Sequence, residues 1–460
     1  MTKRRFSNKQ LIRLILPLLI EQLLVMLVGM ADTIMVSAAG EAAISGVSIV
    51  NDVNNLIIAI LTAVAGGGSV IVTQYLGNRD DENTKMSASQ LIMISFIISL
   101  FFGVLCVLLY KSILQLLYGS VDFEVMESAK TYFWITALSF PFLGVYNSSA
   151  ALYRSMNRTN ITMRVSILMN IINVVGNFIC VYLWKMGAAG VAWPTLVSRV
   201  VASIVMFALC FIKENSIYVT WSDILTWKQI IISKILSIAI PNGIENGLFQ
   251  LGKVLVSTFV ATYGTMQIAA NGVTNSLCVL CYTTEMAMQL AVVTVVGQCV
   301  GANDYDEARY YIRKMLIMAE IMAITNNVIL YLVSPYALNL YTLQAETFKI
   351  AETILGMECL AVGIFHALAF VLPTCLRAAG DAKYTMYVGV ISMFTARVVG
   401  AYLLGTVMGL GVVGTRIAMY IDWIVRIIFF YARYRNGKWT KFRAIYKDWR
   451  INLQSFCFYE

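Results

Sequence analysis

Apolar runs long enough to cross a lipid bilayer recur along almost the whole chain, and this feature limits its fold more than any other. Successive runs of about 20 residues or more extend from Leu11 to Tyr431, and turn residues are confined between them. Only 13% of the residues are charged, against about 25% in soluble domains. The chain is therefore predicted to be an all-α integral membrane protein. Closed outer-membrane barrels are excluded because their strands give short alternating segments.

The apolar runs predict twelve transmembrane helices. Their expected positions are 11–36, 46–75, 87–110, 131–152, 161–184, 188–212, 233–262, 268–299, 311–333, 347–376, 384–405 and 411–432. By this assignment, 25 of the 34 Lys and Arg residues flank the helices on the side of the two termini, and only four lie in the opposite loops. The positive-inside rule then places both termini in the cytoplasm, below a plasma (inner) membrane. Because this asymmetry explains the net charge of +9, no nucleic-acid partner is expected.

The second half of the chain repeats the first half. At an offset of 224 positions, residues 17–80 align without a gap with residues 241–304. Matched residues include Glu21 with Glu245, Val36 with Val260, Gly40 with Gly264, Asn51 with Asn275, Gln74 with Gln298 and Gly77 with Gly301, and at an offset of 223 Arg154 with Arg377 and Thr162 with Thr385. Because each half holds an even number of helices, the two copies have the same orientation. The sequence therefore predicts two parallel-repeat six-helix bundles with a substrate path between them.

The repeat and the charged segments divide the chain into four parts. These are an N-terminal six-helix lobe (1–212), a cytoplasmic linker (213–232), a C-terminal six-helix lobe (233–432) and a basic cytoplasmic tail (433–460). The nine cysteines are spread through apolar helices, so neither a disulfide framework nor a zinc site is expected.

Ionisable and amide side chains inside the predicted helices identify candidate cavity residues. A charged side chain at the bilayer centre costs about 2.5 kcal/mol or more, and such groups usually mark paths of ions or substrates. The candidates for the substrate cavity are Glu21, Asn51, Glu245, Lys253, Asn275 and Arg397. Asp32 follows Glu21 by eleven residues, about three turns, so both side chains are expected on one face of the first helix. Pro17 and Pro241 remove a backbone hydrogen bond at matched places and are predicted hinges.

Four further acids in the helices, and two basic residues beside acids, are interpreted separately. Lys253 lies about two turns after Glu245 and is a possible basic neighbour of that acid. Asp422 and Arg426 are spaced i, i+4 and are interpreted as a structural ion pair. No role is assigned to Glu285, Glu320 and Glu358.

Several motifs in both halves resemble the multidrug and toxic compound extrusion (MATE) transporters. In the first half they are Pro17, Glu21, the run 29–36 (GMADTIMV) and the run 73–77 (TQYLG); in the second half they are Pro241 to Glu245, 295–301 (VVGQCVG) and 377–381 (RAAGD). The resemblance covers about residues 10–435. It implies a twelve-helix, two-lobe fold and multidrug or xenobiotic export. The exported compounds would be organic, cationic or amphipathic, and would exchange for H⁺ or Na⁺.

The resemblance also implies a cation or proton site inside the N-terminal lobe. Members of the family use an Asp fifteen residues after the Pro of the first helix, which here is Asp32. The other positions correspond to Asn173, Asn177 and Thr195, and some members have a second Asp where this chain has Asn177. Because one acid accepts one proton, whereas Na⁺ needs several oxygen ligands, H⁺ is the expected coupling ion and Na⁺ is the alternative. A helix-7 Glu used by other members falls at Phe249.

Two other functions compete with antiport. A flippase for a lipid-linked saccharide with the same two-lobe fold should present several cations to a pyrophosphate. The basic residues inside the predicted helices number five: Arg199, Lys253, Arg397, Arg416 and Arg426. A membrane-embedded enzyme would need a metal-binding acidic motif, but the acidic cluster at 80–82 lies in a short charged loop and is typical of a solvated turn.

No catalytic residue, cofactor or metal is expected beyond a possible Na⁺ at Asp32, and no Walker motif indicates ATP as the energy source. The expected partners are a small organic substrate and the lipid bilayer, and the protein is expected to be a monomer.

Overall fold

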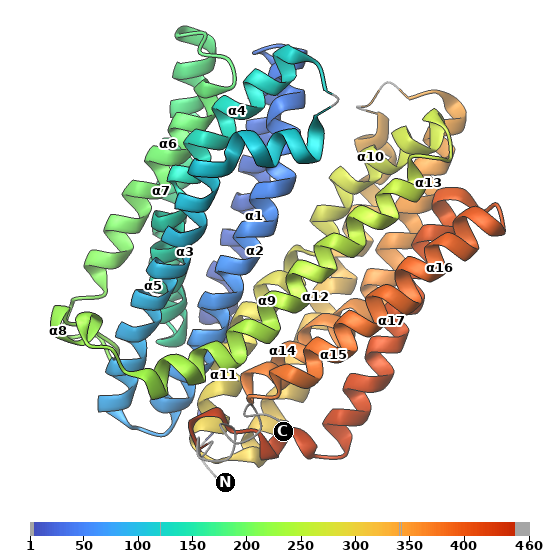
Figure 1. The fold of residues 1–460 in the computed structure, drawn as a ribbon. Helices are drawn as coiled ribbons and strands as arrows, with labels where there is room; N and C mark the ends of the chain where they lie inside the picture. The colour runs from blue at the N-terminus through green and yellow to red at the C-terminus, as the bar shows by residue number, and fades with distance from the viewer. Residues whose placement is uncertain (1–3, 120, 340, 342, 447–460) are drawn as a thin grey trace, which may run out of the picture.

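Helices form almost the whole of this computed structural model, which describes residues 4–119, 121–339, 341 and 343–446 (Figure 1). No strand occurs within these ranges. Of the helices described, nine are long and apolar enough to cross a membrane. The other rods are not among these nine, because α4 and α5 have only 16 residues each, whereas α9 and α17 have polar and charged side chains within their apolar stretches.

Six helical rods form the N-lobe. They are α1 (Asn8–Ser37), α2 (Glu41–Gly77), α3 (Asp81–Tyr118), α4 (Phe123–Leu138) with α5 (Phe140–Ser155), α6 (Thr159–Asn177) with the π-helix η1 (Phe178–Leu183), and α7 (Ala189–Leu209). The short helix α8 (Trp221–Leu225) lies in the connection to the second bundle.

Six further rods form the C-lobe. They are α9 (Gln229–Val260), α10 (Thr265–Cys281) with α11 (Thr283–Gly301), α12 (Tyr305–Asn339), α13 (Ala345–Ala361) with η2 (Val362–Val371) and α14 (Leu372–Ala378), α15 (Ala382–Ser392) with η3 (Met393–Val398), α16 (Val399–Ala401) and η4 (Tyr402–Val407), and α17 (Gly411–Arg435). The predicted all-α fold with twelve transmembrane helices is confirmed.

Some predicted helix boundaries are wrong. The helix expected over 131–152 begins at Phe123 and breaks at Ser139, because Pro141 has no backbone N–H to continue the hydrogen-bond ladder. The helix expected over 268–299 breaks at Tyr282. In the connection between the lobes, α9 begins at Gln229, within the segment expected to be a linker.

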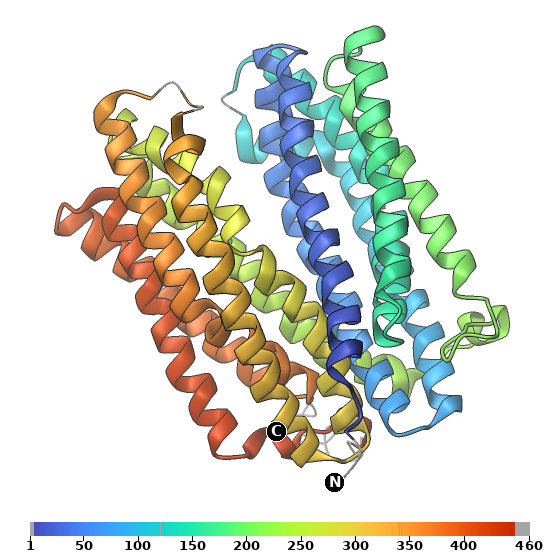
Figure 2. The same cartoon turned by 180° about the vertical axis from the view of Figure 1, so that it is seen from behind.

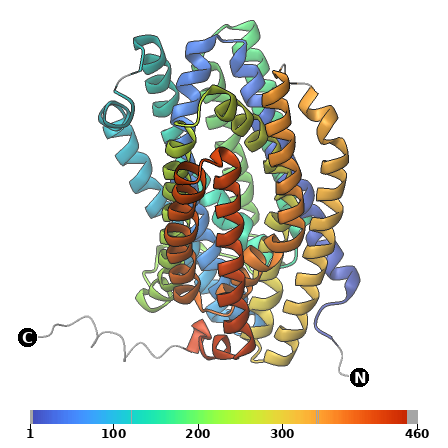
Figure 3. The ribbon, with the colours of Figure 1, turned by 90° about the vertical axis from the view of Figure 1, so that its right-hand side faces the viewer.

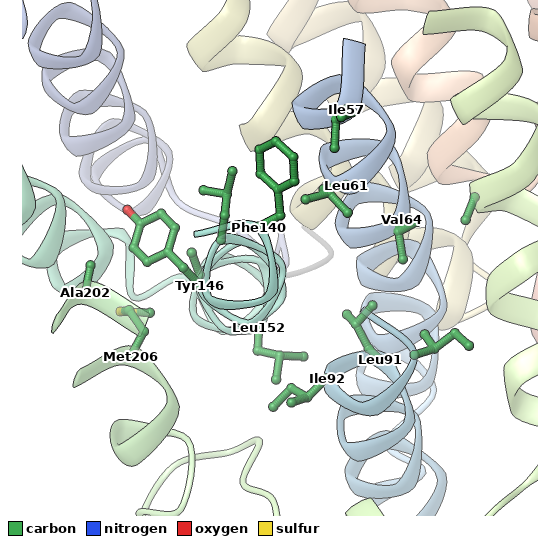
Figure 4. Close-up of a cluster of buried hydrophobic side chains, with 14 of the residues drawn as sticks. Ile57, Leu61, Val64, Leu91, Ile92, Phe140, Tyr146, Leu152, Ala202 and Met206 are labelled. Atoms are coloured by element: carbon green, nitrogen blue, oxygen red, sulfur yellow. The ribbon is translucent and has the colours of Figure 1, made fainter. Parts of the chain in front are cut away.

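The core of the N-lobe consists of apolar side chains from many of its helices, part of which Figure 4 shows. Leu61 and Val64 of α2 lie opposite Leu91 and Ile92 of α3, and residues of α5 and α7 complete the cluster. In the apolar 18-residue stretch of α2 that is long enough to span a membrane, 67% of the residues are buried, against 39% in that of α1. The rod α2 is therefore the central helix of this lobe, and it also forms part of the boundary with the C-lobe.

The two lobes lie side by side and diverge toward the end opposite the chain termini (Figures 1 and 2). At the end near the termini, α2 and α11 approach so closely that a side chain would not fit between them. A Cβ added to Gly77 would lie 2.1 Å from the carbonyl oxygen of Gln298, and a Cβ added to Gly301 would lie 2.0 Å from that of Gln74. These four residues are matched by the sequence repeat, so the contact is symmetric.

Two glutamines reinforce this contact between the lobes. The Nε2 atom of Gln74 donates to the carbonyl oxygen of Ala378 at 2.9 Å, and Nε2 of Gln298 donates to that of Ser155 at 2.9 Å. Each amide therefore joins one lobe to the other. We call the region of α2 and α11 around these residues (73–77 and 297–301) the interlobe seam.

The described end of the C-terminal segment packs below the seam, near the foot of α17 (Figure 3). It contains the short 3-10 helices η5 (Lys438–Lys441) and η6 (Ala444–Tyr446), and Trp439 is fully buried. The backbone N–H of Ala444 donates to Oε1 of Gln74 at 3.0 Å, and Nζ of Lys234 donates to the carbonyl oxygen of Ile445 at 2.9 Å. This segment, expected as part of a basic tail, contacts both lobes.

Candidate functional site

Four polar side chains of the N-lobe form one hydrogen-bonded chain. The Nδ2 atom of Asn177 donates to Oδ1 of Asp32 at 2.6 Å and to Oδ1 of Asn173 at 3.3 Å. Asn173 in turn donates to Oγ1 of Thr195 at 3.1 Å. Helices α1, α6 and α7 thus contribute to one cluster, and it contains all four residues assigned to a coupling site by resemblance.

The cluster is buried except at its acid. Asn177 is fully buried and Asn173 is 6% exposed, whereas Asp32 is partly exposed. The Oδ1 atom of Asn177 is buried and has no hydrogen-bond partner among the described residues. The carboxylate is therefore the group through which an ion can reach the cluster.

Close packing of α6 on α7 brings the two amides to the threonine. A Cβ at Gly176 would lie 2.7 Å from Cβ of Pro194, so only glycine permits this approach. Pro194 lies inside α7 directly before Thr195. The hydroxyl of Thr195 donates to the carbonyl oxygen of Val191 at 2.8 Å, a bond within α7 that leaves its lone pairs to accept from Asn173.

A basic residue on α7 lies within electrostatic range of the acid. Arg199 interacts with the charge of Asp32 and donates from Nη1 to Oγ of Ser139 at 2.7 Å. Tyr132 shares this environment and donates to Oδ1 of Asn51 at 3.2 Å. The positive charge of Arg199 therefore partly compensates the carboxylate, although the two side chains form no direct ion pair.

The two matched glutamates form matched ion pairs. Glu21 is buried, with Oε1 3.3 Å from Nη1 of Arg154 and Oε2 accepting from Thr162 at 3.0 Å. Glu245 is buried in the same way, with Oε2 2.8 Å from Nη1 of Arg377. These arginines, and not Lys253, neutralise the two acids.

The remaining cavity candidates lie at more open positions. Asn51 and Asn275 are exposed, and Asn275 accepts a hydrogen bond from Nη2 of Arg416. Lys253 is exposed and Arg397 is partly buried. The structure does not bring these four residues into one cluster with Glu21 and Glu245.

The hinge candidates lie inside continuous helices. Pro17 is buried within α1 and Pro241 is buried within α9, each four residues before its glutamate. The expected ion pair on α17 is confirmed, because Nε of Arg426 lies 2.9 Å from Oδ1 of Asp422.

The three acids without an assigned role have different surroundings. Glu358 accepts from the hydroxyls of Tyr282 and Tyr420 and lies 3.7 Å from Arg416. Glu285 is fully buried, accepts from Thr284 at 2.8 Å and lies 3.9 Å from Nδ1 of His366. Glu320 is partly buried.

Comparison with known proteins assigns these features to a family. The sequence model of the MatE family matches residues 17–179 and again residues 241–403, which together make up most of both lobes. The chain belongs to the MatE family. The two matches fall on the two halves of the internal repeat, so the duplication is itself a family feature of this MatE protein.

This MatE chain is similar to curated proteins over almost its whole length. It is 28% identical to "Uncharacterized transporter YisQ" of Bacillus subtilis, over 92% of the chain and 93% of that protein. It is 24% identical to "Probable multidrug resistance protein NorM" of Thermotoga maritima, over 96% of the chain and 95% of that protein. The chain is therefore a multi-pass membrane protein of a multidrug transporter family.

Solved MATE structures share the fold. A multidrug resistance MATE family transporter in an outward-facing conformation superposes with a TM-score of 0.86 at 20% identity, covering 94% of this chain and 96% of the other. A MATE structure in a straight conformation superposes with a TM-score of 0.85 at 21% identity, covering 94% and 97%. The two-lobe arrangement is thus the MATE fold.

The sequence did not identify the arginines that lie beside Asp32 and beside the two glutamates of this MatE protein. Arg199 was identified only as a basic residue inside a helix, since its approach to Asp32 depends on how α7 packs against α1. The repeat matched Arg154 with Arg377, and Glu21 with Glu245. An acid and a base that recur together in both halves could have indicated that they form an ion pair in each lobe.

Proposed function

We propose that this protein is a secondary antiporter that exports amphipathic organic compounds in exchange for protons that bind at Asp32. The observation that carries the proposal is the hydrogen-bonded chain from Asp32 through Asn177 and Asn173 to Thr195, on three different helices of the N-lobe. An acid joined to a second helix by one charge-assisted hydrogen bond is a suitable switch, because protonation of the acid weakens that bond.

The bonding within the cluster favours H⁺ over Na⁺. Asn177 directs its amide nitrogen toward both Asp32 and Asn173, and Oδ1 of Asn173 already accepts that bond. A sodium ion would need several of these oxygens at once, and so the cluster would have to rearrange. A proton needs only one free carboxylate oxygen.

The energy of proton entry is sufficient for export. A difference of one pH unit supplies about 1.4 kcal/mol per proton, and a membrane potential of 100 mV supplies about 2.3 kcal/mol per charge.

With both termini in the cytoplasm, as the distribution of Lys and Arg predicts, the diverging end of the lobes faces the outside and the seam closes the cytoplasmic side.

The proposal is tested with the full chain in liposomes, with a pH gradient and a Na⁺ gradient imposed separately. We expect the pH gradient alone to drive transport of an amphipathic dye, and a proton ionophore to abolish this transport. Transport that requires Na⁺ and persists after the pH gradient has collapsed would contradict H⁺ coupling. The expected preference for cationic compounds and the monomeric state remain predictions.

A further inference from the structure

Three cations surround one aromatic ring in the C-lobe. The ring centroid of Phe249 on α9 lies 5.9 Å from Nζ of Lys253, 5.3 Å from Cζ of Arg397 and 5.4 Å from Cζ of Arg426. The three side chains come from α9, η3 and α17 respectively. We call these four residues the Phe249 cluster.

Only one of the three cations has a carboxylate partner among the described residues. Asp422 binds Nε of Arg426 at 2.9 Å, and Arg426 also donates to the carbonyl oxygen of Gly389. The ammonium group of Lys253 has no hydrogen bond or ion pair in the described part of the chain, although the backbone carbonyl of this residue accepts from Ser257. Its electrostatic neighbours are Arg397 and Arg416, both of the same sign.

Arg397 has unused hydrogen-bond donors. Within the described ranges its only hydrogen bond runs from Nη2 to Sδ of Met419 at 2.9 Å, and a thioether is a weak acceptor. Its Nε atom is buried and has no partner in the described structure. Asp422 lies within electrostatic range of Arg397, but its Oδ1 atom is bound to Arg426, and its Oδ2 atom makes no hydrogen bond to Arg397 or to any other described residue.

The cations around Phe249 outnumber the acids that are bound to them. Four cations lie near one another, namely Lys253, Arg397, Arg416 and Arg426, whereas the acids bound to them are Asp422 and Glu358. Glu285 and Glu320 also lie in this lobe, but neither forms an ion pair with any of these four cations. Unpaired cations at low dielectric are costly, and an anion beside them would relieve this cost.

We propose that the Phe249 cluster binds an organic anion, with Lys253 and Arg397 contacting its acidic group and the ring of Phe249 contacting its apolar part. The ring is partly exposed and Lys253 is exposed, so both are accessible to a ligand. This proposal deepens the proposed function, on which it rests for treating the ligand as the transported compound. It differs from the cationic substrates expected from the family resemblance.

The test measures equilibrium binding of two dyes that share a xanthene ring system, the anion fluorescein and the cation rhodamine 123. The full chain is placed in phosphatidylcholine nanodiscs without any gradient, and fluorescence polarisation is recorded. We expect fluorescein to bind the unmodified protein more tightly than rhodamine 123. Lys253→Gln and Arg397→Gln should each weaken fluorescein binding about tenfold or more, the loss expected for a hydrogen bond to a charged group.

Two variants separate charge from structure. Arg397→Lys keeps the positive charge and should retain most of the fluorescein binding lost in Arg397→Gln. Lys349→Gln removes a cation from an exposed position on α13 of the same lobe and should bind fluorescein like the unmodified protein. Equal fluorescein affinity in Arg397→Gln and Lys349→Gln would overturn the proposal. Failure of the unmodified protein to bind fluorescein would also overturn it.

The acidic group that contacts Lys253 and Arg397 could belong to a free organic anion or to the headgroup of an anionic lipid. A lipid ligand is what the alternative flippase function would require. Phosphatidylglycerol in the nanodisc distinguishes them, because a lipid-binding cluster would lose its charge-dependent fluorescein binding through competition, whereas a cluster for free compounds would keep it. Because binding needs no gradient, Asp32→Asn should retain it. Failure of the anion site and failure of proton coupling are therefore separable outcomes.

Discussion

Asn177 on α6 and Asp32 on α1 are joined by a hydrogen bond of 2.6 Å, shorter than the roughly 2.7 to 3.2 Å that is usual between a nitrogen donor and an oxygen acceptor. The same amide nitrogen also lies near Asn173, so the acid is linked through two asparagines to Thr195 on α7. When Asp32 is ionised, this bond holds α1 against α6. When it is protonated, the bond weakens and α1 is freer to move, which connects proton binding to the arrangement of the N-lobe.

Asp32→Asn should abolish transport driven by a pH gradient while it leaves dye binding intact. The amide keeps the volume of the side chain and its hydrogen bonding but cannot bind or release a proton. The measurement is dye transport in liposomes compared with equilibrium dye binding by the same preparation. A variant that still concentrates dye against a gradient would rule out Asp32 as the coupling residue.

Asn177→Asp should make transport sensitive to Na⁺. The substitution replaces a donor amide by a second carboxylate beside Asp32, and two carboxylates attract a hard cation more strongly than one. Dye transport should rise with Na⁺ concentration in the variant and stay constant in the unmodified protein. Asn170→Asp, one turn before Asn173 on the same helix, serves as a control for an added acid outside the hydrogen-bonded chain.

Glu245→Gln should mainly destabilise the fold. Breaking a buried ion pair leaves Arg377 without its partner, and this costs about 3 kcal/mol of unfolding free energy. Arg377→Met should have a similar cost, and the double variant should cost less than the sum. Glu352→Gln, at an exposed position on α13, should leave unfolding unchanged. Lost dye binding with unaltered stability in Glu245→Gln would instead support the expected role in the substrate cavity.

The sequence predicted the helices and the coupling cluster better than it predicted the contacts between distant charges. Twelve apolar runs identify twelve rods because burial in lipid requires such runs wherever a helix spans the bilayer. The family resemblance named Asp32, Asn173, Asn177 and Thr195, and the structure places them in one chain of hydrogen bonds.

Other contacts depend on helix packing that no spacing reveals. Lys253 lies about two turns after Glu245, yet its side chain lies beside the ring of Phe249. The ion-pair partner of Glu245 is instead Arg377, which lies on α14. The repeat matched Gly77 with Gly301 and Gln74 with Gln298. The repeat could not indicate that Gly77 meets Gln298 and that Gly301 meets Gln74. A sequence offset contains no information on where the symmetry axis between the two lobes lies.

The interlobe seam must open if the compound is to be reached from the side of the termini. Thr73 on α2 faces Gly297 on α11, and a Cβ added to Gly297 would lie 3.0 Å from Cβ of Thr73. The Cβ atoms of a disulfide are about 3.5 to 4.5 Å apart, so a small outward shift permits a bond between cysteines at these positions. Thr73 and Gly297 are buried, as are the eight free cysteines of the described residues, so the crosslinked fraction must be measured directly.

The double variant Thr73→Cys, Gly297→Cys should therefore stop transport when oxidised and recover when reduced. A disulfide across the seam holds α2 against α11, and the lobes can then no longer separate at that end. Dye transport is measured before and after oxidation, with the crosslinked fraction determined in the same sample, and Thr73→Cys alone should not respond to the oxidant. Fully crosslinked protein that transports dye as fast as the chemically reduced protein would show that the seam does not open during the cycle. The compound would then have to pass by a route that leaves α2 and α11 in contact.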